Sequence, residues 1–255
     1  MLAADGILAH PEAHRYGAAT MLNRDALSRW IRAEHLDEEA CSGYRDAMAA
    51  HPARMLVLHD LLVPEAADRL ATFLAEGAVF SVEHGLYSTE GDVEPATWEA
   101  APAEDRFFRF GKLSGQRPEA MLSDSMLTYL QWRTFVTEEP FRRFFEAATG
   151  LALGPSDDFG CHEFNVGDFL MAHDDANRSR RLALVLYLTP GWEPSFGGAL
   201  SMTADDGTTE RTEAAFNSMA VFDTTAGSSH RVERIEEAAA GTARRTFGGW
   251  FPDSS

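Results

Sequence analysis

The sequence has little cysteine and no long apolar run. Its 255 residues include two cysteines, Cys41 and Cys161, which are too few for a disulfide framework and form no C-x-x-C pair. The longest apolar run, residues 182–188, falls far short of the roughly 20 residues that cross a bilayer. The first residues lack the basic and then apolar pattern of a signal peptide. We therefore expect a protein of the reduced cytoplasm without a membrane anchor.

Positive charge is scarce as well. Lys and Arg total 22 against 40 Asp and Glu, which gives a formal net charge of −18, and Lys112 is the single lysine. A negative field of this size repels phosphate groups, so we expect neither nucleic acid nor an anionic membrane surface as a partner. We expect a monomer or a homodimer. The apolar share of 45% is ordinary, and a chain of this length can bury a sizeable core.

Helical patterns dominate the first part of the chain. Residues 21–31, 37–50, 63–74 and 123–148 have sequence patterns typical of helices. A short apolar run at 55–62 predicts a strand. Residues 85–105 are rich in Gly, Pro, Glu and Asp, and they predict a loop that serves either as a lid or as a connector.

Short β-rich runs follow from residue 159 onward, separated by turn residues. They are Cys161–Val166, Phe169–His173, Leu182–Leu188, Ala199–Met202, Met219–Phe222, His230–Ile235 and Arg245–Phe251. Helices first and many short strands later predict an α+β fold with a sandwich or barrel of strands. We expect residues 1–54 to form a helical extension packed on a single domain at residues 55–255.

Three histidines have an acidic residue two positions later. Two of these pairs, at residues 10/12 and 35/37, lie in the helical region, where side chains at i and i+2 diverge. His173 ends a strand-like run, so His173 and Asp175 share a face. They suit two positions of a 2-His-1-carboxylate site, which leaves open positions on Fe(II). His230, the only later histidine, is the candidate third ligand.

The last strand-like run carries a candidate anion-binding arginine. Alternation places Arg244, Thr246 and Trp250 on one face, and the small Thr246 leaves room for an inward guanidinium. Such a guanidinium binds a carboxylate through two parallel hydrogen bonds. Tyr187, in an otherwise apolar run, offers a hydroxyl to the same carboxylate. The alternatives are a surface arginine on an edge strand and a core tyrosine, and we expect Trp250 to pack in the core.

These motifs resemble those of the 2-oxoglutarate/Fe(II)-dependent oxygenases over about residues 159–252. The resemblance is to the prolyl-hydroxylase superfamily, particularly the branch that acts on a prolyl residue in a ribosomal protein. A weaker likeness extends over residues 55–74. The motifs are His173-Asp174-Asp175, Arg180-Arg181, Leu186-Tyr187-Leu188-Thr189-Pro190-Gly191-Trp192, Gly197-Gly198-Ala199-Leu200, Ser229-His230-Arg231-Val232-Glu233 and the stretch from Arg244 to Phe251.

The resemblance implies a double-stranded β-helix core of the jelly-roll, cupin-like type. It places Fe(II) on His173, Asp175 and His230, and 2-oxoglutarate on Arg244 and Tyr187, with Thr246 beside them. O2 is then the second co-substrate and ascorbate a candidate stimulant.

The implied reaction hydroxylates an unactivated C–H bond of a small-molecule amino acid or of a peptide or protein substrate. The amino acid is free, carrier-linked or peptidyl, with proline among the options, and succinate and CO2 are released. Phe164 stands where this family commonly has a tyrosine, so one hydroxyl is absent. The alternative is a non-catalytic or 2-oxoglutarate-independent cupin-like metal-binding protein.

Overall fold

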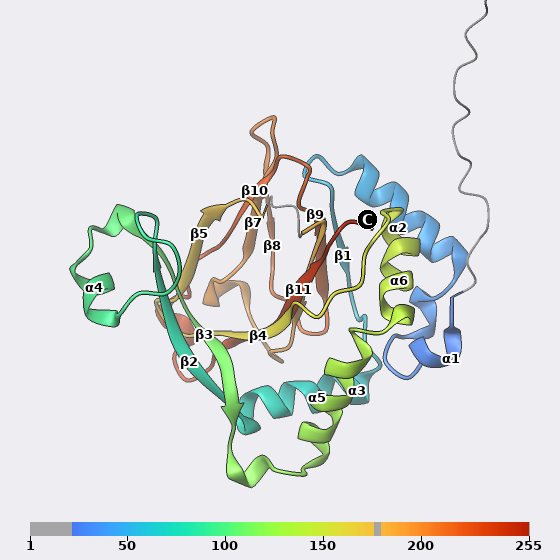
Figure 1. Ribbon diagram of the computed structural model, residues 1–255, viewed down its shortest axis with the longest axis horizontal. Coiled ribbons are helices and arrows are strands. Elements are labelled where there is room, and N and C mark those ends of the chain that lie inside the picture. Colours follow the sequence, from blue (N-terminus) through green and yellow to red (C-terminus); the bar gives the residue numbers. More distant parts are fainter. Residues whose placement is uncertain (1–21, 176–179, 255) are drawn as a thin grey trace, which may run out of the picture.

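Antiparallel strands form one curled sheet in the computed structural model, which describes residues 22–175 and 180–254 (Figure 1). Its order is β1-β9-β6-β11-β4-β3-β5-β10-β7-β8, and β2 pairs with β3 outside this path. The strands are β1 (Met55–Leu58), β2 (Ala78–Leu86), β3 (Arg106–Gln116), β4 (Phe159–Phe164), β5 (Phe169–His173), β6 (Leu182–Tyr187), β7 (Leu200–Thr203), β8 (Thr209–Thr212), β9 (Met219–Asp223), β10 (Ser229–Val232) and β11 (Arg244–Phe251).

The sheet curls so that two groups of strands face each other. We call β1, β9, β6, β11 and β4 the helix-covered half and β5, β10, β7 and β8 the open half; β3 joins them. In β6, Leu182, Leu184 and Leu186 belong to the core on one face, and Ala183 and Tyr187 belong to the cluster on the other. This alternation with a period of two is what a strand buried on both faces requires.

Helices cover the outer face of the helix-covered half, and Figure 1 shows all of them along that side of the sheet except the helix at residues 95–100, which lies on the other side. Trp132 contacts Phe247 with ring centroids 5.6 Å apart, and Phe145 contacts Phe251 at 6.3 Å. No helix in the described part of the chain is long and apolar enough to span a bilayer. The helices are α1 (Arg24–Leu27), α2 (Glu38–Ala50), α3 (Pro64–Thr72), α4 (Pro95–Ala100), α5 (Asp124–Phe135) and α6 (Glu139–Thr149).

The predicted helical stretch at residues 123–148 consists of two helices. The first helix ends at Phe135 and the second begins at Glu139, with Pro140 in its first turn. Proline lacks the N–H that a helix interior needs but is well placed in a first turn, so the break falls just before it.

The predicted loop at residues 85–105 is wrong in part. The end of β2 and the whole of α4 lie within it, so this stretch connects the two long strands of a hairpin, of which β3 belongs to the main path of the sheet (Figure 1). Trp98 of α4 is buried against Phe169 of the open half, with ring centroids 6.2 Å apart. The stretch is therefore packed on the core, at least through this helix.

Candidate active site

A cavity of about 360 Å³ lies between the two halves of the sheet. Its wall includes His173, Asp175 and His230 in one part and Arg244 and Thr246 in another. Aromatic side chains make up much of the remaining surface: Phe107, Phe108, Phe110, Phe164, Phe222 and Trp250. The sequence-predicted metal ligands and the predicted anion-binding arginine therefore line the same cavity.

The sheet register brings the two predicted histidine ligands together. His173 at the end of β5 lies directly opposite His230 in β10, and their ring centroids are 4.1 Å apart. Asp175 follows two residues later, with its carboxylate oxygens 3.8 Å from His173 Nε2 and 3.4 Å from His230 Nε2. All three donor atoms lie within 4.8 Å of one another, which is the spacing that one cation can bridge. Two imidazoles and one carboxylate on one side of a cavity fit Fe(II) with positions left open.

Each histidine can offer the lone pair of one ring nitrogen to a metal ion. His173 Nδ1 lies 3.0 Å from the carbonyl oxygen of Met171, so Nδ1–H donates to this oxygen and Nε2 keeps its lone pair. Burial and the neighbouring His173 lower the pKa of His230 to about 4. His230 is therefore neutral at pH 7, the form that binds a metal.

Two donors hold the Asp175 carboxylate from outside the trio. The indole N–H of Trp250 donates to Oδ2 at 3.0 Å, and Arg180 Nη1 donates to Oδ1 at 2.7 Å. The Arg180 guanidinium also lies 3.7 Å above the Trp250 ring. Groups that orient a ligating carboxylate in this way commonly tune metal affinity.

Arg244 is buried together with Tyr187, and neither has its polar atoms satisfied. Arg244 is 2% exposed and Tyr187 1%. Within the described residues, Arg244 Nε and Nη2 and the Tyr187 hydroxyl lack any hydrogen-bond partner. The guanidinium carbon lies 5.0 Å from the centre of the Tyr187 ring. Burying a positive charge with unpaired N–H donors costs free energy unless an anion balances the charge and accepts the hydrogen bonds. Arg244 and Tyr187 therefore suit the binding of a ligand carboxylate.

The strand register confirms the predicted faces of β11. Arg244, Thr246 and Trp250 line the cavity, while Arg245 on the other face pairs with Glu163 at 2.7 Å. The edge-strand alternative is therefore wrong, because β11 lies between β6 and β4. Tyr187 is not among the residues that line the described cavity; its ring packs against Arg244 instead.

A glycine makes room for the buried arginine. Gly198 has a positive φ of 71°, and a Cβ built there would lie 2.8 Å from Arg244 Cδ and 2.5 Å from Ile235 Cδ1. A side chain at this position would both strain the backbone and displace Arg244. The Gly-Gly motif that carried part of the resemblance therefore has a physical role at the site.

The His-x-acid pair at residues 35 and 37 does not build a site. His35 is buried, with Nδ1 2.7 Å from the Tyr44 hydroxyl and Nε2 3.2 Å from the carbonyl oxygen of Asp60, while Asp37 pairs with Arg24. It is a structural histidine, as its helical context predicts. The pair at residues 10/12 lies outside the described residues.

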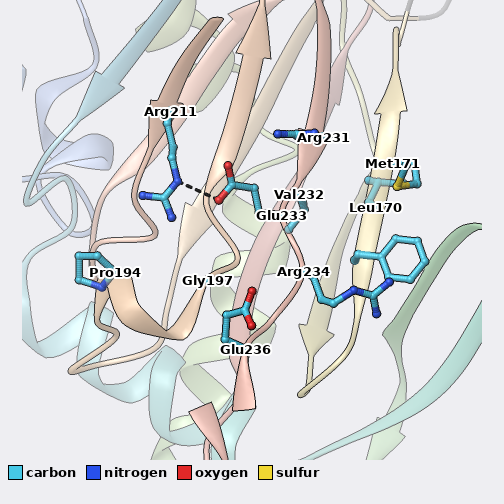
Figure 2. Close-up of a pocket in the computed structure, with 11 residues that line it drawn as sticks. Leu170, Met171, Pro194, Gly197, Arg211, Arg231, Val232, Glu233, Arg234 and Glu236 are labelled. Carbon is cyan, nitrogen blue, oxygen red and sulfur yellow. Dashed lines mark hydrogen bonds and ion pairs between the residues drawn. The ribbon is translucent and has the colours of Figure 1, made fainter. Parts of the chain in front are cut away.

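A second hollow, of about 380 Å³, is lined by Arg211, Arg231, Glu233 and Arg234 (Figure 2). Arg211 Nε donates to Glu233 at 2.8 Å, as the dashed line in Figure 2 marks. Arg234 donates to the carbonyl oxygen of Gly167 and its guanidinium lies over the Phe169 ring. Because these charged groups already have protein partners, the inner cavity is the better candidate for chemistry.

Sequence reasoning missed three polar residues of the cavity, one of which is Arg180, the donor to Asp175 Oδ1. Trp250 was expected in the core but donates its N–H to Asp175, and the shared face with Arg244 was the available signal. His162 lines the cavity opposite Thr246, and no His-x-acid spacing marks it.

Comparison with known proteins agrees with this geometry. Residues 159–252 match the family described as the 2OG-Fe(II) oxygenase superfamily. Over 121 residues the chain is 31% identical to Prolyl 3-hydroxylase OGFOD1 of Mus musculus, covering 44% of this chain and 22% of that protein. It is 32% identical over 124 residues to Prolyl 3,4-dihydroxylase OGFOD1 of Ostreococcus tauri, covering 44% of this chain and 24% of that protein. The chain thus spans less than a quarter of the length of these relatives.

Solved structures confirm the predicted double-stranded β-helix fold. A Pseudomonas putida prolyl-4-hydroxylase superposes with a TM-score of 0.53 at 22% identity, covering 84% of this chain and 100% of that one. A prolyl hydroxylase from Trichoplax adhaerens, in complex with a hypoxia inducible factor oxygen degradation domain peptide fragment, gives 0.58 at 14% identity, covering 85% and 90%. The family uses Fe(II), 2-oxoglutarate and O2, and the donors in the cavity fit them. Residues 159–252 therefore resemble the 2OG-Fe(II) oxygenase superfamily, and the chain is similar in sequence and fold to prolyl hydroxylases.

Proposed function

We propose that this protein is an Fe(II)- and 2-oxoglutarate-dependent dioxygenase that hydroxylates a prolyl residue in a peptide or protein. One observation carries the proposal: a single cavity contains both a His173/Asp175/His230 trio and the buried, unsatisfied donors of Arg244. In the overall reaction, the substrate C–H bond, 2-oxoglutarate and O2 become the C–OH product, succinate and CO2. The metal and co-substrate supply this oxidation when bound, and the protein supplies position and shielding from water.

In this proposal the trio holds the metal on one face. His173 and His230 donate neutral Nε2 lone pairs, and Asp175 supplies a negative charge that offsets part of the charge of Fe(II). Trp250 and Arg180 fix the two carboxylate oxygens of Asp175 by hydrogen bonds of 3.0 and 2.7 Å. Because the carboxylate cannot rotate freely, the open positions keep a fixed direction into the cavity.

The other end of the cavity binds the carboxylate of 2-oxoglutarate that does not bind the metal. Arg244 offers two unpartnered donor nitrogens, Nε and Nη2, and the Tyr187 hydroxyl has no partner within the described chain either. Thr246 is buried on the same face of β11. A charged donor fork in a dry site favours a dianion of the correct length over a monocarboxylate, because only the dianion satisfies both ends.

The remaining wall suits an uncharged ring. Phe107 contacts His173 edge to face with centroids 5.6 Å apart, and Phe108 lies beside it on the cavity wall. An apolar wall next to the metal favours an aliphatic ring such as proline over a charged side chain. The names of the relatives and of the Trichoplax complex support a peptidyl substrate.

Three further statements remain predictions of the sequence. They are a boundary between a helical extension and the oxygenase domain near residue 54, a location in the cytoplasm, and a monomeric or homodimeric state. The two cysteines are buried and free, which is consistent with a reducing compartment.

The test is coupled turnover. The protein is loaded with Fe(II) under anaerobic conditions, then given O2, 2-oxoglutarate and either a library of proline-containing peptides or a panel of free amino acids. We expect a peptide to gain one oxygen atom for each succinate formed. Asp175→Ala and Arg244→Ala abolish this turnover, while Asp174→Ala, which removes the exposed neighbouring acid, does not.

Three results separate the alternatives. Hydroxylation of a free amino acid would keep the chemistry and overturn the peptidyl substrate. Turnover that does not need 2-oxoglutarate would favour a cupin-type metalloenzyme. Binding of metal without binding of 2-oxoglutarate and without turnover would favour the non-catalytic alternative.

A further inference from the structure

His162 lies in a row of three side chains that cross the helix-covered half. In the sheet register Thr246 of β11 is directly opposite Tyr187 of β6 on one side and His162 of β4 on the other. Side chains at paired positions of adjacent strands point to the same face. His162 and Thr246 both line the cavity, so His162 faces the end at which Arg244 lies.

The ring of His162 has no hydrogen-bond partner among the described residues, although it is closely surrounded. Phe110 of β3 meets it edge to face with centroids 5.2 Å apart. The charged groups that act on it are Lys112, opposite it on β3, and Arg244. Burial, Lys112 and Arg244 lower its pKa to about 4. At pH 7 the imidazole is therefore neutral and offers one N–H donor and one lone pair.

Phe164 lies two residues after His162 on the same face of β4, and it provides no polar group to the cavity. It is paired with Arg244 in the register, and the guanidinium carbon lies 5.1 Å from the centre of its ring. The phenyl ring packs against the guanidinium but offers no hydrogen bond. His162 is therefore the polar side chain that β4 contributes to this end of the cavity.

We propose that His162 binds the same 2-oxoglutarate carboxylate as Arg244, by donating one ring N–H to it. This inference rests on the proposed function and assigns a further binding residue to it. The neutral imidazole adds a directed donor to an anion whose charge Arg244 already balances. The N–H of His162 thus supplies a hydrogen-bond donor from β4, which the phenyl ring of Phe164 cannot supply. The unpartnered donors of Arg244 and Tyr187 and one ring N–H of His162 then converge on one carboxylate.

The experiment measures 2-oxoglutarate binding by calorimetry to the Zn(II)-loaded protein, in which no turnover occurs. His162→Phe keeps the ring that packs against Phe110 and removes the N–H; we expect the Kd to rise about tenfold, the effect of losing one hydrogen bond to a charged group. His162→Gln keeps a donor and is expected to stay within about threefold of wild type. His59→Phe makes the same change at an exposed histidine and should leave the Kd unchanged.

A second readout follows the ring itself. The His162 proton resonance, identified by its absence in His162→Gln, should shift when 2-oxoglutarate is added to the Zn(II)-loaded wild type. The proposal is overturned if His162→Phe binds 2-oxoglutarate as tightly as wild type, or, should this variant not fold, if the resonance does not move at saturation. If wild type binds Zn(II) but no 2-oxoglutarate, the proposed function itself fails and this inference fails with it.

Discussion

Replacing Trp250 by Phe tests whether the metal site depends on the groups that hold Asp175. The change removes the indole N–H that donates to Asp175 Oδ2 at 3.0 Å and keeps an aromatic ring for the Arg180 guanidinium, which lies 3.7 Å from the ring centre. A hydrogen bond to a charged group contributes roughly 1.5–3 kcal/mol. Removing such an outer partner of a metal ligand commonly weakens metal binding by about 10- to 100-fold. We therefore expect Trp250→Phe to bind Zn(II) and Fe(II) at least tenfold more weakly than wild type, as measured by competition with a chelator.

Trp192→Phe is the matched control. Its indole N–H donates to the carbonyl oxygen of Gly197, also at 3.0 Å, and the residue does not line the described cavity. The same atoms are thus removed at the same hydrogen-bond length, without a metal ligand as acceptor. Equal metal affinities for the two variants would refute the reasoning, because Trp250 would then act only through packing. The unfolding midpoint of each metal-free variant separates a general loss of stability from a loss of metal affinity.

Three further predictions concern the other end of the cavity. Arg244→Lys keeps the positive charge but loses the two parallel N–H donors of the guanidinium. We expect 2-oxoglutarate to bind the Zn(II)-loaded variant at least tenfold more weakly, while the affinity for Zn(II) is retained. Equal binding of 2-oxoglutarate would contradict the role of Arg244 in binding its carboxylate. Gly198→Ala should lower the free energy of unfolding by about 1–3 kcal/mol through its positive φ and should weaken 2-oxoglutarate binding through displacement of Arg244, which denaturation and calorimetry measure. The pKa of His162 falls from 6.5 to about 4 on folding, so the unfolded chain binds more protons and stability falls as the pH drops from about 6.5 towards 4. Between pH 7 and pH 5 the metal-free wild type should lose about 2 kcal/mol more than His162→Gln in urea denaturation, and equal losses would contradict the lowered pKa.

The positions of the candidate metal ligands could be predicted because they depend on local rules. His173 and Asp175 are two residues apart at the end of a strand, which fixes their shared face. The faces of β11 follow from the same alternation, and they place Arg244 and Thr246 inward and Arg245 outward.

What could not be predicted depends on register and on tertiary contacts. β8 has the polar sequence of residues 209–212 and is mostly exposed, so no apolar pattern marks it; pairing with β7 alone defines it. The long β2–β3 hairpin contains polar and glycine residues on its exposed faces, and its strands are defined by pairing with each other over residues 78–116. No sequence motif marks His162, because its place at the cavity depends on the strand pairing that sets it opposite Thr246. Trp250 is recognised as a partner of Asp175 only when the fold brings the end of β11 to the segment that follows β5.

The most direct measurement of the central claim is the fate of molecular oxygen. The Fe(II)-loaded protein is supplied with 2-oxoglutarate and ¹⁸O₂, with and without an unmodified peptide that the turnover assay has identified as a substrate. The account predicts one labelled oxygen in each succinate and, with peptide present, one in the new hydroxyl group, with both products lost in Asp175→Ala and kept in Asp174→Ala. Absence of labelled succinate from an iron-saturated wild type, or equal labelling in Asp175→Ala, would contradict the account.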